Sequence, residues 1–341
     1  MKKLSIDQVA ELAYVSRSVV SRVLNNHKNV SDEARERVMK VVEEHNYQPS
    51  SVARGLATNR NYEIGIVAPR RCDETLGNGF WSLLHLGIFE ECIDNGYFVT
   101  LSPISTDKGA DINENILDEK RLDGYILLTQ EVTDFVINKL KEQDVPMVVV
   151  GHDEQNHEIT SIDVNNFSGV KKSTTHLIEL GHKRIGAIMA SPNMKESVDR
   201  INGYKAALNE ANLPITDKYI AVDDYSQRHG YSTMKKWIKE GLDITGVVCM
   251  SDTLAMGALL ALHEESIPVP EEFSVVGFDD LPIAQYTIPP LTTVQQPIYQ
   301  KGQRAANLLV NQIENKEANI VHENLEAELI VRQSSDIAPQ K

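Results

Sequence analysis

The first sixty residues carry the signals for three short helices around a tight turn. Ser5-Ile6-Asp7-Gln8 has the capping-box pattern, a hydroxyl residue with Gln three positions later, and this pattern starts a helix. Tyr14-Val15-Ser16 is expected to form a tight corner, and a second short helix to run from Arg17 to about Leu24. A third helix is expected from Ser31, which two acidic residues follow. This arrangement predicts a helix-turn-helix unit.

Charge is divided unequally along the chain. Residues 1–60 carry ten Lys and Arg against seven Asp and Glu, a net charge of +3, whereas residues 61–341 carry 24 against 42, a net charge of −18. The formal charge of the complete chain, −15, would as an average argue against a nucleic-acid partner. A basic end on an acidic body instead predicts that one end meets phosphate while the rest stays soluble and repels DNA.

Residues 61–341 exceed a typical single domain and alternate short apolar runs with amphipathic stretches. Strands are expected at Glu63–Ala68, Phe98–Leu101, Gly124–Leu128, Met147–Val150, Ile185–Met189, Tyr219–Val222, Val247–Met250 and Ser274–Phe278. Helices are expected at Leu83–Asn95, Thr133–Gln143, Ser168–Leu180, Arg200–Asn212 and Thr253–Glu265. This alternation predicts parallel sheets with right-handed crossovers. Eight or more strands predict two doubly wound halves that divide near Ser161 and face each other across a ligand cleft.

The sequence lacks the signatures of several other protein classes. No Walker loop and no G-x-G-x-x-G, H-E-x-x-H or G-x-S-x-G motif occurs, so neither an enzyme nor a cofactor is expected. The cysteines, Cys72, Cys92 and Cys249, are odd in number and scattered, as in reduced proteins of the cytoplasm. His152-Asp153 and His157 have no standard zinc spacing, so no metal site is expected. The absence of a signal peptide and of an apolar run near ~18 residues predicts a cytoplasmic protein.

Two segments of the N-terminal unit resemble the lactose-repressor/galactose-repressor (LacI/GalR) family. Val15-Ser16-Arg17-Ser18-Val19-Val20-Ser21-Arg22-Val23-Leu24-Asn25 resembles the family's recognition segment, usually V-S-x-x-T-V-S-R-V-L-N. Asn46-Tyr47-Gln48-Pro49, followed by Val52-Ala53-Arg54-Gly55-Leu56-Ala57, looks like its hinge. Two positions depart from the pattern. Tyr14 stands where the family usually has Gly, so a turn that needs positive φ would be strained, and Val19 replaces a Thr whose hydroxyl suits phosphate.

The resemblance continues through the body to Val331-Arg332-Gln333-Ser334-Ser335. Its motifs LGH-RI, ND-xx-A-xG, VVG-[YF]-DD and P-x-LTT-x-x-Q-P correspond to residues 180–185, 251–257, 276–280 and 288–297. The resemblance implies an α/β protein with a lambda-repressor-like helix-turn-helix domain at residues 1–46, a hinge with a short helix at 47–61, and a periplasmic-binding-protein-like body. Residues 62–161 with about 295–323 would form one doubly wound subdomain of this body, and residues 162–294 with about 324–336 the other.

The family's recognition helix and hinge imply which residues contact DNA. Arg17 would reach guanine from a helix in the major groove, and Leu56 would wedge between base pairs in the minor groove. The alternatives are a backbone contact for Arg17 or Arg22 and an ordinary linker role for Leu56. A hinge helix of this length is marginal alone, so we expect it to order only when held. The expected DNA-contacting residues are Ser5, Ser16, Arg17, Ser18, Ser21, Arg22, Asn25, Val30, Tyr47, Val52, Ala53, Arg54 and Leu56.

The body motifs imply a site for a small-molecule effector. Arg200 offers a planar fork of donors suited to vicinal hydroxyls or a carboxylate, and Asp279 would accept a hydrogen bond from a ligand hydroxyl. Phe80 and Trp81 offer aromatic faces that could stack on a sugar ring. The alternatives are core packing for the two aromatic residues and a structural ion pair for Arg200 with Asp279. The expected effector-contacting residues are Phe80, Trp81, His152, Arg200, Tyr225, Ser251, Asp279 and Gln296.

Together these features predict a transcription regulator that binds double-stranded DNA at a pseudo-palindromic operator. We expect it to repress carbohydrate-utilisation genes and to be released by a mono- or oligosaccharide. A homodimer is expected because two half-sites need a twofold axis, and no heptad repeat, as in the family's tetrameric members, follows Leu329-Ile330-Val331. Two alternatives stay open: a corepressor-dependent or activating regulator with a non-sugar effector, and a sugar-active enzyme fused to a DNA-binding unit.

Overall fold

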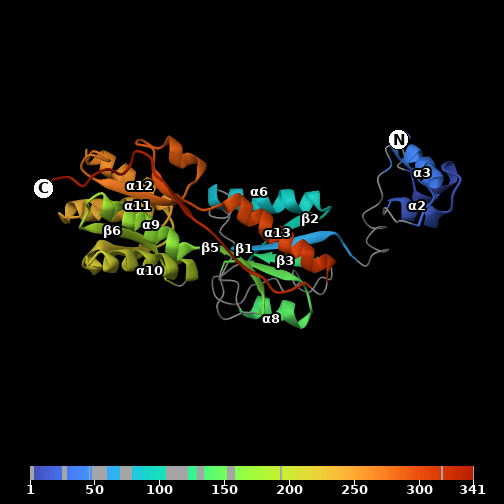
Figure 1. The fold of residues 1–341 in the computed structure, drawn as a ribbon, viewed down its shortest axis with the longest axis horizontal. Coiled ribbons are helices and arrows are strands. Elements are labelled where there is room, and N and C mark those ends of the chain that lie inside the picture. The colour runs from blue at the N-terminus through green and yellow to red at the C-terminus, as the bar shows by residue number, and fades with distance from the viewer. Residues whose placement is uncertain are drawn as a thin grey trace. The chain divides into compact units, whose positions relative to one another are not determined.

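The chain forms two compact units, Met1–Tyr62 and Glu63–Lys341, here called the head and the body (Figure 1). The computed structural model describes residues 4–24, 29–45, 47, 60–69, 79–104, 122–128, 134–151, 158–192, 194–315 and 318–340. Each unit is built from the elements that its own residues dictate, and each has its own hydrophobic core.

The head consists of α1 (Ile6–Leu12), α2 (Arg17–Leu24) and α3 (Asp32–Glu44). The expected capping box is confirmed, because the Ser5 hydroxyl accepts from the Gln8 N–H at 3.3 Å and the Gln8 side chain accepts from the Ser5 N–H at 2.8 Å. The hydroxyl of Ser31 caps α3. Apolar side chains from the three helices meet in one core, where Val9, Val20 and Val38 are completely buried. The predicted three-helix unit is therefore confirmed.

Tyr14 ends α1 in the left-handed region, with φ 54°. Its N–H donates to the carbonyl of Glu11, and the N–H of Val15 donates to the carbonyl of Ala10, which is the Schellman pattern of helix ends. For a residue with a side chain this conformation costs roughly 1–2 kcal/mol. The Tyr14 side chain is 85% exposed, so burial offsets little of this cost. The strain expected at this position is present.

The first sheet of the body has the strand order β11-β5-β4-β3-β1-β2, and all its strand pairs are parallel. Helices α6 (Gly79–Asp94), α8 (Asp134–Glu142) and α13 (Ile298–Glu314) belong to this subdomain. Its strands are β1 (Glu63–Pro69), β2 (Phe98–Ile104), β3 (Gly124–Leu127), β4 (Met147–Val150), β5 (Thr160–Val164) and β11 (His322–Leu325).

The second sheet has the order β12-β10-β9-β8-β6-β7, and only β12 runs antiparallel to its neighbour, β10. Its strands are β6 (Ile185–Ala190), β7 (Ile220–Asp223), β8 (Gly246–Cys249), β9 (Ser274–Asp279), β10 (Thr292–Gln295) and β12 (Glu328–Ile330). Its helices are α9 (Asn166–Glu179), α10 (Lys195–Glu210), α11 (Gln227–Lys239) and α12 (Asp252–Glu264), with 3-10 turns η1 (Asp217–Tyr219) and η2 (Pro282–Tyr286). Two doubly wound sheets were expected, and they are confirmed.

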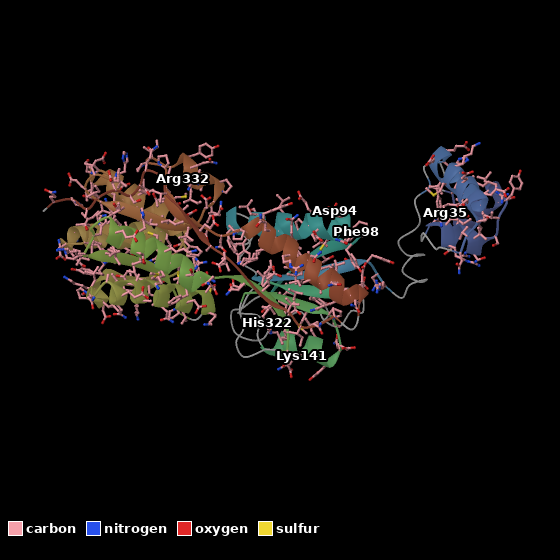
Figure 2. The ribbon with its side chains drawn as sticks, viewed as in Figure 1. Arg35, Asp94, Phe98, Lys141, His322 and Arg332 are labelled. Atoms are coloured by element: carbon pink, nitrogen blue, oxygen red, sulfur yellow. The ribbon has the colours of Figure 1, made fainter. Side chains whose placement is uncertain are left out.

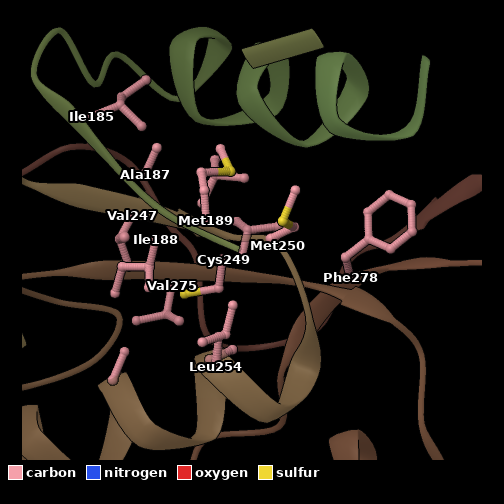
Figure 3. Packing of buried hydrophobic residues seen from close by; sticks show 14 of the residues in the cluster. Ile185, Ala187, Ile188, Met189, Val247, Cys249, Met250, Leu254, Val275 and Phe278 are labelled. Atoms are coloured by element: carbon pink, nitrogen blue, oxygen red, sulfur yellow. The ribbon is translucent and has the colours of Figure 1, made fainter. Parts of the chain in front are cut away.

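The helices of the second subdomain lie on both faces of its sheet, with α9 and α10 paired on one side and α11 and α12 on the other (Figure 1). The core of this subdomain joins buried residues of the strands β6, β8 and β9 with buried residues of all four helices. In Figure 3, Ile188, Cys249 and Leu254 meet at its centre. All three side chains are completely buried. The long apolar runs in the strands are explained by this burial on both faces.

The chain passes between the two sheets three times. It leaves the first sheet after β5, returns to it with α13 after β10, and passes from β11 to β12 near its end. The predicted break at Ser161 falls inside β5, so the first sheet extends to Val164. Periodicity did not indicate β5, because its polar side chains Ser161 and Asp163 are buried by specific partners rather than by apolar neighbours. Helices α11 and α13 and strands β10 and β11 were also not predicted, and Tyr219 lies in η1 rather than in β7.

Helices α6 and α13 approach so closely that a glycine is needed on each. A Cβ atom on Gly87 would lie 2.1 Å from the carbonyl oxygen of Tyr299, and one on Gly302 would lie 2.2 Å from the carbonyl oxygen of Leu84. Figure 1 shows the two helices side by side. Their contact fixes the first turns of both helices relative to each other, and Phe80 and Lys301 lie in these turns.

Candidate DNA-binding face and effector site

Helix α2 presents a polar face on the surface of the head. Arg17, Ser18 and Arg22 are exposed, whereas Val20 and Val23 on the opposite face are buried in the head core. Ser16, just before the helix, is exposed, and its hydroxyl lies 2.8 Å from that of Ser18. The N-terminal half of α2 therefore offers a guanidinium and hydroxyls to a partner, which is the chemistry that base edges and phosphates need.

Within the described part of the head, the guanidinium of Arg17 is held only weakly. Its guanidinium lies 3.8 Å from the carboxylate of Asp7, and both side chains are 66% exposed. Exposed ion pairs of this kind contribute about 0–1 kcal/mol, so the guanidinium can exchange Asp7 for a nucleic-acid partner at little cost.

The same two charges act on Tyr47. Burial raises the pKa of the Tyr47 hydroxyl, the charge of Asp7 raises it further, and the charge of Arg17 lowers it.

The other expected DNA-contacting residues divide into three groups. The Ser5 hydroxyl caps α1, and Ser21 is half-buried on α2. Val30 and Tyr47 are half-buried and pack against the head core. Asn25, Val52, Ala53, Arg54 and Leu56 lie outside the described residues.

In the body, Arg200 is buried on α10 and held from three directions. Its Nε donates to Oδ1 of Asn166 at 2.8 Å, and its Nη1 donates to the carbonyl of Met250. The guanidinium carbon lies 3.8 Å from the centroid of the Phe278 ring. A guanidinium has five N–H donors, and these contacts fix its plane while using only part of that set. Arg200 is thus oriented in the way that a binding arginine requires.

Asp279 ends β9 with φ 119°, a backbone conformation that residues with side chains rarely adopt. Its Oδ1 accepts a hydrogen bond of 2.5 Å from the Nε2 of Gln296, and both side chains are buried. Burial raises the pKa of Asp279 from 3.8 to about 6, while Arg200, Gln296 and Lys301 oppose the rise. Burial also raises the pKa of the neighbouring Asp252 well above its ordinary value, with a further contribution from Asp279. Asp279 therefore changes between its charged and neutral forms near pH 6 rather than near pH 3.8.

Ser251 and Tyr225 occupy different settings within this region. The Ser251 hydroxyl caps α12 by accepting a hydrogen bond from the N–H of Leu254 at 3.2 Å. The Tyr225 hydroxyl lies 3.2 Å from the hydroxyl of Ser197. Burial raises the pKa of Tyr225, and the charges of Arg200 and of acidic neighbours that include Asp279 also act on it. Tyr225 therefore belongs with the Arg200 and Asp279 group.

The aromatic pair at the start of α6 is half-buried and arranged edge to face. The ring centroids of Phe80 and Trp81 are 5.1 Å apart with an interplanar angle of 85°. The ammonium of Lys301 lies 5.4 Å from the centroid of the Phe80 ring. Phe80 thus contacts the buried lysine of this region. Trp81 instead packs near His85, one turn further along α6, with 6.4 Å between the ring centroids.

Sequence reasoning missed four polar residues of this region: Asp163, Asn166, Glu196 and Lys301. Lys301 is 5% exposed, its ammonium lies 3.4 Å from Oδ1 of Asp163, and Asp163 in turn accepts from the side chain of Asn166. Burial raises the pKa of Glu196, which Arg200 and Lys301 lower. A signal was available for Lys301, because it shares the helical spacing of the buried residues Ile298 and Ala305 on the apolar side of α13.

The structure therefore joins Arg200, Asp279 and Gln296 with residues that were not predicted. We call Asp163, Asn166, Arg200, Asp279, Gln296 and Lys301 the junction cluster. Its members come from both subdomains and lie at or just after the ends of strands, or on the helices α10 and α13. The buried side chains offer both donors and acceptors, and the nearby Phe80 offers a ring face. Such a set can bind a small polyhydroxylated or planar polar molecule.

The remaining expectations concern His152, metal binding and membrane-spanning helices. His152, expected to contact the effector, lies outside the described residues, as do Asp153 and His157. Within the described part of the chain, His, Cys, Asp and Glu side chains form no group of three or more that could hold a metal ion. None of the described helices combines the length and apolar character needed to cross a membrane.

Comparisons with known proteins agree with both units. Residues 5–50 match the family model of bacterial regulatory proteins of the lacI family, and residues 174–335 match a periplasmic binding protein-like domain. The HTH-type transcriptional repressor PurR of Actinobacillus pleuropneumoniae serotype 3 (strain JL03) is 31% identical over 335 residues, which are 97% of this chain and 98% of the relative.

Two solved structures resemble the chain over nearly its whole length. The transcriptional regulator CelR in complex with cellobiose is 29% identical with a TM-score of 0.75, and the match covers 97% of this chain and all of that one. The lac repressor dimer bound to operator and the anti-inducer ONPF is 25% identical with a TM-score of 0.81, covering 98% and 100% of the two chains. With its helix-turn-helix head and two-sheet body, the chain belongs to the lacI family of DNA-binding transcriptional regulators.

Proposed function

We propose that the chain represses carbohydrate-utilisation genes and that a small sugar bound in the body releases it from its operator. The exposed polar face of α2, with Arg17, Ser18 and Arg22 side by side, carries the DNA half of the proposal. A single head reads one short half-site, so we propose that a homodimer binds a pseudo-palindromic operator. The net charge of −18 on residues 61–341 supports a geometry in which only the heads meet DNA.

The chemistry of the junction cluster supports a sugar as effector. Asp279 offers a carboxylate acceptor and Arg200 offers planar donors that can span two neighbouring hydroxyls. The face of Phe80 can pack on the C–H face of a sugar ring. A neutral polyol also adds no charge to a buried region in which the acids Asp163, Asp279 and Glu196 already face Arg200 and Lys301. CelR, whose fold this chain shares, was solved with cellobiose.

One observation keeps a second candidate open. The faces of Phe80 and Trp81 suit a flat heterocycle as well as a sugar, and donors and acceptors beside them could bind its edge. The second candidate is therefore a regulator whose non-sugar effector promotes DNA binding. A sugar-active enzyme on a DNA-binding head is a further alternative, which chemical conversion of the bound ligand would reveal.

The proposal is tested with operator DNA selected from a random library by the full-length protein. Fluorescence anisotropy then measures the affinity for this duplex alone and with a panel of ribose, glucose, cellobiose and adenine. A sugar that weakens operator binding, typically by 1–3 kcal/mol for such coupling, supports the proposal. If adenine instead tightens binding, the second candidate is correct. If no duplex is enriched, the DNA-binding proposal fails.

The oligomeric state is measured in the same preparation. Light scattering of the free protein and of the operator complex is expected to give two chains per particle. A tetramer at micromolar concentration would contradict the homodimer. Arg17→Ala serves as the DNA-binding control, because it changes the head and leaves the body residues intact.

A further inference from the structure

Lys301 occupies a buried position of α13, where a lysine is unusual. It lies on the buried side of α13, next to Gly302 and in helical register with Ile298 and Ala305, and is only 5% exposed. An ammonium taken out of water is costly unless it is paired and hydrogen-bonded. A simple apolar residue would fill this position without that cost. The contacts of Lys301 therefore need to be identified one by one.

Among the described residues, three contact the ammonium of Lys301, and each belongs to a different part of the body. Asp163 at the end of β5 lies at 3.4 Å. The side-chain oxygen of Gln296, just after β10, lies at 3.5 Å. The centroid of the Phe80 ring at the start of α6 lies at 5.4 Å. One charged group thus contacts two buried polar side chains and an aromatic face.

Two hydrogen-bonded arms extend from these neighbours to the residues proposed to bind the effector. Asp163 accepts from the side-chain nitrogen of Asn166 at 3.3 Å, and the oxygen of Asn166 accepts from Arg200 at 2.8 Å. Gln296 donates to Asp279 at 2.5 Å. The side-chain oxygen of Gln296 accepts from Lys301, and its side-chain nitrogen donates to Asp279. An amide turned the other way could make neither hydrogen bond. The orientation of Gln296 is thereby fixed.

We propose that Lys301 is the positioning residue of the effector site, holding Arg200 and Asp279 in register across the two subdomains. This inference deepens the proposed function and rests on it for the roles of Arg200 and Asp279. Lys301 acts on Arg200 through Asp163 and Asn166, and on Asp279 through Gln296. It also fixes the Phe80 ring, so a single ammonium organises the donor, the acceptor and the aromatic face.

The electrostatics of Asp279 support this arrangement. The charged and titratable groups that act on it or on its partner Asp252 are Arg200, Lys301, Tyr225 and Asp280. Burial raises the pKa of Asp279 to about 6, and Lys301 is among the groups that lower it. The pKa of Asp279 in the folded protein thus lies above its ordinary value of 3.8. Folding stability from this group is present at low pH and is lost as pH rises through about 6.

The test uses the full chain and needs no knowledge of the effector. The thermal unfolding midpoint is measured against pH for the wild type, Lys301→Met, Lys301→Arg and Lys171→Met. Lys171 pairs with Glu210 at 2.7 Å on the surface of α9 and α10, so its variant controls for the loss of an ion pair outside the cluster. Asp279→Asn is combined with Lys301→Met to show whether the effect passes through Asp279.

Removing the charge of Lys301 raises the pKa of Asp279 further. The pH at which stability stops falling should therefore move upward in Lys301→Met by up to about 1 unit, the lower end of the shift for loss of a nearby opposite charge. Lys301→Arg should restore most of the profile, and the shift should be clearly smaller in the Asp279→Asn background, where Glu196 is the remaining acid whose pKa Lys301 lowers. Lys171→Met should keep the wild-type profile. An unshifted profile in Lys301→Met overturns the proposal.

A second variant covers the case in which Lys301→Met leaves Asp163 unpaired and does not fold. Asp163→Asn with Lys301→Met removes both charges of the buried pair. The profile should still be shifted, because the arm to Asp279 is lost. If stability recovers and the profile is that of the wild type, Lys301 serves only its ion pair and the proposal is wrong.

Fluorescence of Trp81 gives an independent readout of the aromatic arm. The only other tryptophan, Trp237, lies buried in the core of the second subdomain and provides a constant background. Lys301→Met should shift the emission, and Lys301→Arg should not. If the proposed function is wrong, the DNA and sugar assays fail, but the pH profile and the Trp81 emission still change as expected in Lys301→Met. If the role of Lys301 is wrong, the pH profile and the emission stay unchanged. The two failures can therefore be told apart.

Discussion

The side-chain nitrogen of Gln296 lies 2.5 Å from Oδ1 of Asp279, so the carboxylate expected to receive the effector already has a protein partner. A carboxylate offers about four acceptor positions, and the hydrogen bonds from Gln296 and from the backbone of Asp252 leave the others for a ligand. The bond fixes the direction in which those positions point. It also joins Asp279, at the end of β9, to the segment through which the chain leaves β10 for α13. Ligand binding at Asp279 is thereby connected to the junction between the subdomains.

Asp280 is fixed by a different partner. Its Oδ1 lies 2.6 Å from Nη2 of Arg332, which is labelled in Figure 2, and its backbone also has a positive φ of 54°. Gln295 donates to its other oxygen at 2.8 Å. Strained residues persist only where the surroundings hold them. Asp279 and Asp280 are therefore held by the side chains of Gln296 and Arg332 respectively.

Arg17→Ala should weaken operator binding and relax the preference at one base pair in each half-site. Loss of a bidentate guanine contact costs roughly 1–3 kcal/mol, whereas the exposed ion pair to Asp7 contributes little. Binding to a panel of base-substituted operators measures the effect, with Lys40→Ala on α3 as the surface control. Unchanged preference across the panel would show that Arg17 contacts only the backbone.

Tyr14→Gly should stabilise the head by about 0.5–1 kcal/mol, because glycine removes the left-handed strain at some cost in chain entropy. The Tyr14 side chain is mostly exposed, so little burial is lost. Urea unfolding of the full chain, followed through hydrogen exchange of the head amides, measures the change. Tyr14→Val should be destabilising by comparison. Equal or lower stability of Tyr14→Gly would mean that the Tyr14 ring contributes more than its exposure indicates.

Gly302→Ala should destabilise the body by about 1–3 kcal/mol, because the added Cβ would lie 2.2 Å from a backbone carbonyl of α6. A backbone atom cannot move aside as a flexible side chain can. Thermal unfolding of the full chain measures the loss. Gly241→Ala is an informative comparison, because its Cβ would meet no atom within 4 Å and only its positive φ would oppose the change. A neutral Gly302→Ala would show that α6 and α13 can separate freely.

Effector binding should weaken as the solution is acidified through about pH 6. Burial raises the pKa of Asp279 to about 6, so the carboxylate that accepts from a ligand hydroxyl is lost below that value. Affinity should fall by about tenfold between about pH 7.5 and about pH 5. Calorimetric titration with the sugar identified in the operator assay measures this. Asp279→Asn should bind weakly at both values, and a pH-independent wild type would place the ligand elsewhere.

Asp279→Ala and Leu56→Ala should separate the two functions of the protein. Asp279→Ala should lose the effector response but keep its operator affinity, which leaves a repressor locked on DNA. Leu56→Ala should lose operator affinity but keep effector binding, because Leu56 is expected to contact DNA. Both affinities are measured for each variant. If Asp279→Ala still responds at the wild-type effector concentration, the effector binds outside the junction cluster.

Local patterns in the sequence determined the three helices of the head, its capping box and the corner at Tyr14, and the family resemblance added the strain expected there. These features depend on residues three to five positions apart, and a capping hydroxyl or a left-handed residue has the same effect in any fold. Apolar runs likewise indicated eight strands, because burial on both faces of a parallel sheet leaves a continuous apolar segment. The family's motifs then marked Arg200, Asp279 and Gln296.

Only the tertiary structure decided how these residues are held. Strand β5 and helix α13 escaped prediction because their polar residues, Asp163 and Lys301, are buried by each other, 138 positions apart in the chain. The helical spacing of Lys301 with Ile298 and Ala305 could have marked it as buried, but no local pattern can indicate its partner, since the energy that stabilises each charge comes from the other. The three passages of the chain between the sheets bring them together, and with them Gln296, Asn166 and the two expected effector residues.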